Sequence, residues 1–155
     1  METTPQMMFI PEFKIGEDRF GVEYDVNNQR LLTAFRLRNH PVKQYEVKAG
    51  TKIISDGAFD SLVELESILL PDSIEIIESR AFFHCASLER IHLPVSLHQI
   101  GAYAFCSCTN IKEVSIDEQN DYFKVEDGFI LSKDGSTLIY AIPGQTSYIL
   151  PKTCS

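Results

Sequence analysis

The side chains best suited to chemistry in this 155-residue chain are its four cysteines and four histidines. Thiols can form disulfides or bind zinc, and imidazoles can bind metals or transfer protons. The cysteines are Cys85, Cys106, Cys108 and Cys154, and the histidines are His40, His84, His92 and His98. What these groups can do depends on which of them the fold brings together.

Their spacing along the chain does not match a known reactive arrangement. Structural zinc sites usually use Cys-x₂₋₄-Cys spacing, and Cys106-x-Cys108 beside His84-Cys85 is tighter than that. No histidine has a nucleophile or carboxylate at a telling spacing, and no Gly-x-Ser-x-Gly, phosphate loop or His-Glu-x-x-His occurs. The acidic stretch 117–121 lacks the calcium-loop pattern. We therefore expect no catalytic residues, no metal and no cofactor, and we expect that the protein is not an enzyme.

Composition disfavours several classes of partner. The chain has 14 Lys and Arg against 22 Asp and Glu, a formal charge of −8, and 44% of its residues are hydrophobic. An acidic chain is a poor match for nucleic acid or anionic lipid, which need a basic surface. No apolar run approaches the roughly 20 residues of a membrane helix, and residues 1–11 lack the pattern of a secretory signal. We expect no nucleic-acid partner and no membrane insertion.

A 23-residue repeat organises the middle of the chain. The dipeptide Ala-Phe occurs at 58–59, 81–82 and 104–105, and the apolar positions around it keep the same period. Residues 51–73 and 74–96 are identical at ten of 23 positions, where chance would give about one or two. Partial units surround Tyr45 and Val47, before the first full unit, and Tyr148 to Pro151, after the last. So short a unit cannot bury its apolar face alone, which predicts a solenoid of stacked coils.

The pattern within one unit predicts a strand followed by a turn. Ile68 and Leu70 lie two residues apart and share one face of the strand, while Ser67 and Leu69 point to the other face. Pro71 ends the strand because it has no N–H to donate. The Ala-Phe segment that follows, with its small and polar residues, predicts a short helix or 3₁₀ turn on the opposite wall.

The repeat places Cys85 and Cys108 at the same position of adjacent coils, about 5 Å apart. That separation permits a disulfide. A ladder of small buried thiols that continues from Leu62 is the preferred interpretation, because free cysteine is among the most buried residue types. A thiol- or metal-dependent protein that uses Cys85, Cys106 and Cys108 remains as an alternative.

The unit Ile-x-x-Ile-x-x-x-Ala-Phe-x-x-Cys-x-x-Leu-x-x-Ile-x-Leu-Pro, taken from 74–94, resembles the BspA-type leucine-rich repeat. The resemblance covers about 41–119, with a weaker echo at 148–155. It implies an α/β leucine-rich-repeat solenoid with a parallel β-sheet on the concave wall and short helical or 3₁₀ turns on the convex wall. Members of this family are often bacterial or protist surface proteins that contact host or matrix proteins. The resemblance therefore implies a protein partner and a cell-surface or secreted location.

β-Hairpins are expected on both flanks of the repeats. Alternating residues around an Asn-rich turn predict one hairpin within 17–39. A second hairpin within 121–142 resembles an insertion found between repeats of this family, and Asp134-Gly135 is its turn. The apolar residues before this turn are Phe123, Val125, Phe129, Ile130 and Leu131, and those after it are Leu138, Ile139, Tyr140 and Ile142. The chain is then one domain in three parts, with a capping hairpin region at 1–40, coils at 41–119, and a hairpin insertion with a final partial repeat at 120–155.

The outward strand positions define the candidate binding surface, which we call the concave face. One ladder across it holds Gln44, Ser67, Arg90 and Glu113, and the other holds Glu46, Leu69, His92 and Ser115. This mixture of charges, hydroxyls and one exposed leucine suits a protein partner better than a small ligand. An ordinary solvated sheet face is the alternative. We expect a non-catalytic protein-interaction module, and a structural scaffold fragment of a larger bacterial surface or adhesin protein is the second hypothesis.

Overall fold

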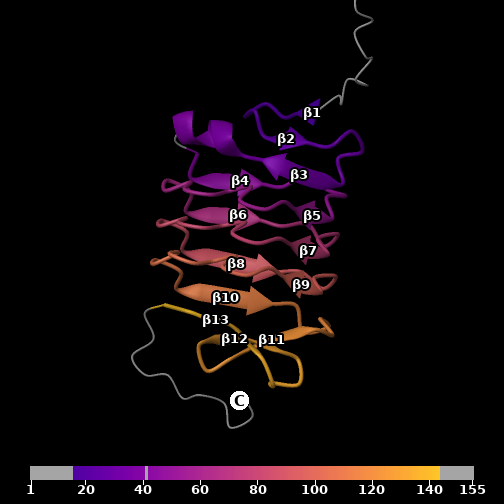
Figure 1. Cartoon of the computed structure of the whole chain (residues 1–155), viewed down its shortest axis with the longest axis vertical. Helices are drawn as coiled ribbons and strands as arrows, with labels where there is room; N and C mark the ends of the chain where they lie inside the picture. The colour runs from indigo at the N-terminus through magenta and orange to yellow at the C-terminus, as the bar shows by residue number, and fades with distance from the viewer. Residues whose placement is uncertain (1–15, 41, 144–155) are drawn as a thin grey trace, which may run out of the picture.

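The computed structural model describes residues 16–40 and 42–143, which form one continuous stack of coils (Figure 1). The predictions that concern residues 1–11, the partial repeat at Tyr148 to Pro151, and Cys154 lie outside these described residues. Along the stack, each coil contributes one strand to each of two parallel walls (Figure 1). The predicted solenoid with parallel sheets is therefore confirmed.

The first wall is a four-stranded parallel sheet with the strand order β10-β8-β6-β4. Its strands are β4 (Gln44–Glu46), β6 (Ser67–Leu69), β8 (Arg90–Leu93) and β10 (Glu113–Ile116). Tyr45 lies opposite Ile68, and Ile68 lies opposite Ile91, so the pairing follows the sequence period. These side chains are buried, because a strand turns alternate residues to opposite faces.

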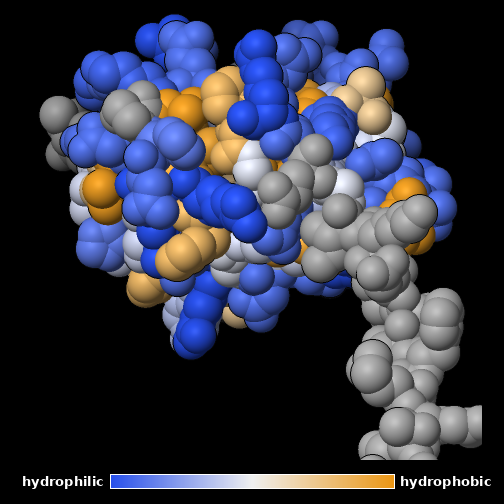
Figure 2. Space-filling model, turned by 90° about the horizontal axis from the view of Figure 1, so that it is seen from above, coloured by the Kyte–Doolittle hydropathy of each residue, from blue (hydrophilic) through white to orange (hydrophobic). Residues whose placement is uncertain are grey.

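The second wall is a six-stranded sheet with the strand order β1-β2-β3-β5-β7-β9. Its strands are β1 (Gly16–Glu17), β2 (Glu23–Tyr24), β3 (Arg30–Thr33), β5 (Ile53–Ile54), β7 (Ile76–Ile77) and β9 (Gln99–Ile100). The first three strands pair antiparallel, and β3 also pairs parallel with β5. The N-terminal hairpin is thus continuous with the coils. Figure 2 views the molecule from this end and shows a largely hydrophilic surface.

The helical turns predicted for the convex wall do not form in the repeat coils. Within the described residues, the 3₁₀ segment is η1 (Phe35–Asn39), which precedes the first full unit. In the turn segment of each of the first two full coils, every second backbone amide donates to a carbonyl of the same segment. The amides between them donate to carbonyls of the next coil. Ala58 N–H donates to Ser55 O at 3.0 Å, whereas Phe59 N–H donates to Ala81 O at 2.8 Å. A helix would need every amide to bond within its own segment.

Two left-handed residues in each coil cause this alternation. They have positive φ angles at the same repeat positions, which are Gly57, Arg80 and Tyr103, and then Ser61, His84 and Ser107. A left-handed residue reverses the direction of the following peptide and cannot belong to a right-handed helix. Five of the six are not glycine, so the sequence carried little sign of them.

Stacked phenylalanines fill the space between the walls. Phe59, Phe82 and Phe105 lie face to face, with ring centroids 5.1 and 5.4 Å apart and interplanar angles of 9° and 3°. Tyr45 contacts the first ring and Tyr140 contacts the last. The Ala-Phe repeat therefore supplies a continuous aromatic core along the stack.

The C-terminal part is a three-stranded antiparallel sheet rather than a single hairpin. Its strands are β11 (Phe123–Glu126), β12 (Phe129–Ser132) and β13 (Leu138–Ala141). A further turn that was not predicted lies between β11 and β12, where Asp127 and Gly128 have φ angles of 49° and 83°. Positive φ at both central residues is the requirement of a two-residue type I′ hairpin. The turn at Asp134-Gly135 forms as predicted, with Ser132 N–H bonded to Thr137 O at 2.9 Å.

A buried ladder in the solenoid begins and ends with a polar residue. Ile74 and Leu97 occupy its centre, and Thr51 and Asn120 occupy the same repeat position in the flanking coils. All four side chains are fully buried. Asn120 satisfies its amide by donating to the carbonyls of Pro94, Val95 and Leu97 and by accepting from the amides of Tyr122 and Phe123. Asn120 thereby joins the last coil to the C-terminal sheet.

Candidate protein-binding groove

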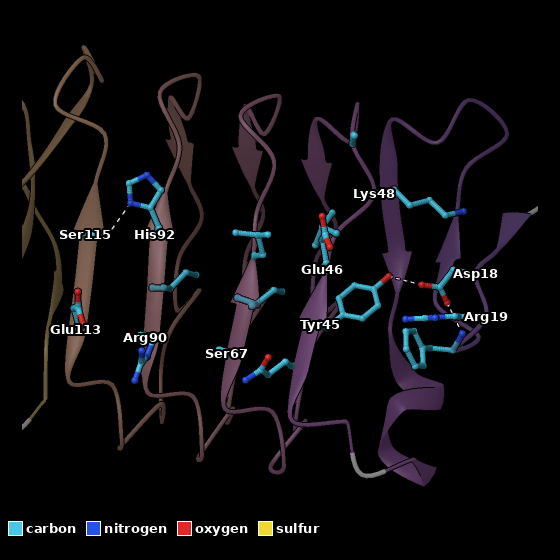
Figure 3. Close-up of a pocket in the computed structure, with 17 residues that line it drawn as sticks. Asp18, Arg19, Tyr45, Glu46, Lys48, Ser67, Arg90, His92, Glu113 and Ser115 are labelled. Atoms are coloured by element: carbon cyan, nitrogen blue, oxygen red, sulfur yellow. Dashed lines mark hydrogen bonds between the residues drawn. The ribbon is translucent and has the colours of Figure 1, made fainter.

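A groove of about 830 Å³ runs across the outer face of β4, β6, β8 and β10 (Figure 3). All eight residues predicted for the concave face line it: Gln44, Glu46, Ser67, Leu69, Arg90, His92, Glu113 and Ser115. These residues share one face because of the strand register, in which Gln44 pairs with Ser67, Ser67 with Arg90, and Arg90 with Glu113. The strand register thus brings the residues of the predicted ladders together, and their role in binding a partner stays a prediction.

The centre of the groove is apolar and its C-terminal part is polar. Leu69 is 57% exposed at the centre, which is unusual for a leucine in a sheet. On the next two strands His92 Nδ1 lies 2.8 Å from Ser115 Oγ, and this contact fixes the imidazole ring across the groove. A partner would meet one apolar contact flanked by polar groups.

The N-terminal cap completes the groove with residues that the sequence did not reveal. Asp18, Arg19 and Phe20 come from the loop between β1 and β2, and Lys48 follows β4 (Figure 3). None of the three loop residues belongs to the repeat, so no periodicity could have placed them. The groove is therefore shared between the cap and the coils.

A buried network holds the cap loop against the first coil. Asp18 Oδ1 accepts from the amides of Phe20 and Val22, and Asp18 Oδ2 accepts from the Tyr45 hydroxyl at 2.6 Å. The Tyr45 and Tyr24 hydroxyls lie 2.7 Å apart. Burial and the bond to Asp18 raise the pKa of Tyr45, so its hydroxyl remains a donor. The loop that carries Arg19 is thus fixed in position.

The charged side chains of the groove form no ion pairs with one another or with other residues in the described part of the chain. The groove holds three cations and three anions, which are Arg19, Lys48 and Arg90, and Asp18, Glu46 and Glu113. None of them takes part in an ion pair among the described residues. The groove is electrically balanced although the whole chain carries a charge of −8.

Charges elsewhere on the coils are paired between neighbouring coils. Lys43 lies 2.8 Å from Glu66, Lys52 lies 3.3 Å from Glu75, and Lys112 lies 3.4 Å from Glu89. In each pair the partners are 23 residues apart in the sequence, one repeat. Each exposed pair contributes no more than about 1 kcal/mol to stability. Other exposed charges, such as Arg80 and Glu118, take part in no ion pair among the described residues, and in the groove the carboxylate of Asp18 is held by hydrogen bonds.

The cysteines form the predicted buried ladder and not a disulfide. Cys85 and Cys108 are free and buried, in line with Leu62. Cys85 Sγ donates to Phe59 O at 3.1 Å, and Cys108 Sγ donates to Phe82 O at 2.9 Å. The side-chain hydrogen bond with Cys108, together with burial, raises the pKa of Cys85. Cys85 therefore lacks both the exposure and the lowered pKa of a reactive cysteine. The hydrogen bond with Cys85 lowers the pKa of Cys108, but its side chain is buried as well.

No grouping of metal-binding side chains accompanies the groove. Within residues 16–40 and 42–143, no three His, Cys, Asp or Glu side chains lie close enough together to hold a metal ion. In the same part of the chain, no helix has the length and apolar character needed to cross a bilayer. The groove therefore offers contacts by charge, hydrogen bond and one apolar surface.

The chain has parallel strands that are in register and stacked at a fixed period, with a groove on the outer face of the first wall. These features define a repeat solenoid of the leucine-rich-repeat class. The model of the BspA-type leucine-rich repeat region matches residues 33–127 in six copies. The chain belongs to this family. The match extends the repeats beyond the 41–119 taken from the sequence, because β3 and η1 already build a coil.

Solved structures with similar coils are bacterial proteins. A leucine rich cell surface protein from Faecalibacterium prausnitzii is 28% identical over 61% of this chain and 25% of its own, with a TM-score of 0.55. The pneumococcal vaccine antigen PcpA is 30% identical over 73% of this chain and 29% of its own, with a TM-score of 0.65. A leucine-rich repeat protein from Bacteroides capillosus is 20% identical over 66% of this chain, with a TM-score of 0.52, and shares the fold. The chain spans under a third of the length of the first two. No curated protein sequence matches it.

Proposed function

We propose that this chain is a non-catalytic protein-interaction module and that it binds a protein partner in the concave groove. The observation that carries the proposal is a groove that gathers three cations and three anions around the exposed Leu69, none of them in an ion pair among the described residues. Unpaired charges around an apolar centre provide electrostatic complementarity, which selects a partner and speeds its association. Leu69 supplies the apolar contact at the centre.

The charge balance of the groove favours a protein over other macromolecules. A nucleic acid or an anionic membrane would favour an excess of cations, whereas the groove has three of each sign. The groove is also open and crosses four strands, unlike the enclosed and mainly apolar pocket of a small ligand. A polypeptide surface that carries both signs of charge fits it best.

Site-specific cross-linking followed by charge reversal tests this proposal. A photo-crosslinking residue at Ser67 in the groove captures the partner, and the same residue at Arg80 on the opposite wall serves as the control. Arg90→Glu and Glu113→Arg are then expected to weaken the captured partner at least about tenfold each, with a lower salt dependence of the association rate. The matched controls are Arg80→Glu and Glu118→Arg, which reverse exposed charges outside the groove. Unchanged affinity in both groove variants would exclude the groove as the binding site.

We also propose that the coils belong to a surface-exposed scaffold. The supporting observation is the likeness to a leucine rich cell surface protein, of which the chain spans 25%. Protease treatment of intact cells, followed by antibody detection, tests this location. Loss of the protein from intact cells supports the proposal, and protection until lysis contradicts it.

A further inference from the structure

The turn segments 56–61, 79–84 and 102–107 stack into a layer that we call the turn wall. At its C-terminal side this wall ends in a row of backbone amides that have no acceptor among the described residues. In the first full coil, Gly57, Phe59 and Ser61 donate to the carbonyls of Ser79, Ala81 and Phe83, at 2.8 to 3.1 Å. In the second coil, Arg80, Phe82 and His84 donate in the same way to Ala102, Ala104 and Cys106, at 2.8 to 3.0 Å. The third coil has the equivalent amides at Tyr103, Phe105 and Ser107, and no described residue accepts from them. Three donors at alternate residues are therefore left facing the end of the stack.

A second groove lies directly beside this row of amides. It has a volume of about 660 Å³, and residues 100–109 form one side while β13 and Pro143 form the other. Most of its side chains are small or apolar, including Ala102, Ala141 and Leu138. Tyr103, at its rim, is 67% exposed, so a large aromatic surface is left uncovered. The groove is thus bounded by unpaired donors and apolar side chains.

The opposite side of this groove is formed by β13, the last strand of its sheet in the order β11-β12-β13. The groove therefore lies between the row of amides and this strand.

We propose that this end groove binds an extended segment of a partner polypeptide, whose carbonyls accept from Tyr103, Phe105 and Ser107. The spacing supports a polypeptide, because the same three donors in each earlier coil meet three separate carbonyls at every second residue. A small anion could reach one or two of these amides but could not span the row. This is the mode of recognition in which backbone bonds provide affinity and side-chain positions provide selectivity. The proposal concerns a surface apart from the concave groove and does not depend on it.

A peptide with the chain's own sequence is a suitable probe. Residues 78–86 include the carbonyls that accept from the equivalent amides of the first full coil, and a synthetic version with Cys85→Ser avoids oxidation. It is added to the ¹⁵N-labelled full chain, and amide shifts and hydrogen exchange are followed by NMR. We expect downfield shifts and at least about tenfold slower exchange at the three amides. A scrambled peptide is expected to leave them unchanged.

Two variants separate the groove from its surroundings. Ala141→Arg blocks the groove at an exposed lining residue and is expected to abolish the shifts. Thr137→Arg adds the same side chain to an exposed position on the hairpin outside the groove and is expected to preserve them. Loss of binding in both variants would contradict the proposed location.

Four other outcomes would overturn the proposal. The first is no change at the three amides on addition of millimolar peptide. The second is an equal response to inorganic phosphate, which would define an anion site. The third is protection of the amides in the free chain at any concentration, which would mean that the chain fills its own groove. The fourth is protection that grows with protein concentration, which would mean self-association.

Discussion

Replacing Asn120 with alanine is expected to destabilise the last coil and the C-terminal sheet together. The side chain is fully buried and makes five hydrogen bonds to backbone groups. The shortest are its donation to Leu97 O and its acceptance from the amides of Tyr122 and Phe123, each at 2.8 Å. Alanine removes every one of these partners and leaves a cavity.

The magnitude follows from the number of groups left unpaired. A buried donor or acceptor without a partner costs about 1–3 kcal/mol. Leu97 O and the amide of Phe123 lie in buried surroundings, whereas the contact with Tyr122 is partly open to water. We therefore expect Asn120→Ala to lower the free energy of unfolding by about 3–5 kcal/mol, which is large for a single substitution.

An isosteric change separates the lost donors from the lost volume. Asn120→Asp keeps the acceptor but turns an oxygen toward the carbonyls of Pro94 and Leu97, so burial and these oxygens raise the pKa of the new carboxyl in the folded state. Below the unfolded pKa of about 3.9 the group is protonated in both states and can donate one O–H. Above it the unfolded state loses its proton first, so stability relative to wild type falls with rising pH, by at most about 1.4 kcal/mol per pH unit.

Urea unfolding followed by far-UV circular dichroism at pH 4 and pH 7 measures both effects, since the chain has no tryptophan. Thr51→Val is the control at the other end of the same ladder. It removes the bond from Thr51 Oγ1 to Lys48 O and is expected to cost about 0.5–1.5 kcal/mol at either pH. A loss below about 1 kcal/mol for Asn120→Ala, or a pH-independent Asn120→Asp, would refute the role given to this residue.

Three further predictions concern other parts of the stack. Gly101→Ala is expected to lower the free energy of unfolding by at least about 1–3 kcal/mol, because its Cβ would lie 2.4 Å from Ser79 N. Gly16→Ala, where the nearest atom is 3.4 Å away, is the control, and equal losses would contradict the steric argument. Hydrogen bonds from Ser132 and Ser136 lower the pKa of Asp134 to about 2, so the turn keeps this support above the ordinary value of about 3.9 and loses it as the pH falls toward 2. The amide shift of Ser136 is expected to titrate at that low value and to become flat in Asp134→Asn. Cys85 and Cys108 are expected to react with a thiol reagent only after unfolding, whereas the half-buried Cys106 reacts in the native state, and rapid native modification of all three would contradict the buried ladder.

The outward-facing residues of the first wall, which is formed by β4, β6, β8 and β10, were predictable because two simple regularities combine there. The period of 23 fixes which residues of adjacent coils pair, and side-chain alternation then fixes which of them face outward. These rules placed Arg90 beside Glu113, as the register shows. Nothing further about the tertiary structure was needed for the ladders.

The conformation of the turn wall was not predictable because most residue types at its left-handed positions do not indicate a positive φ angle. Arg80, His84, Tyr103 and Ser107 adopt positive φ, which side chains other than glycine rarely favour. Bonds to neighbouring coils compensate for that cost, so the tertiary stack decides the local structure. Only Gly57 gave a sign of it in the sequence.

The cap side of the groove depends on contacts between distant residues. The bond between Tyr45 and Asp18 joins positions 27 residues apart, and it brings Arg19 to the groove. No repeat relates the cap loop to the coils. In contrast, the turn at Asp127-Gly128 carried an ordinary hairpin signal, which was hidden within an apolar stretch.

The coil-to-coil bonds of the turn wall also give this wall a direction in electrostatic terms. The amides of Phe59 and Phe82, and the equivalents on either side, all point toward the C-terminal end, so their peptide dipoles of about 3.5 D add rather than cancel. In the strand walls, by contrast, amides such as those of Lys52, Glu66 and Glu89 donate to the preceding coil, so the dipoles there oppose this direction. The turn wall alone therefore has a dipole perpendicular to the local chain direction, with its positive pole at the third coil. Carboxylates near that end and cations near the cap are stabilised by it, which makes the two ends of this wall electrically distinct although each coil repeats the last.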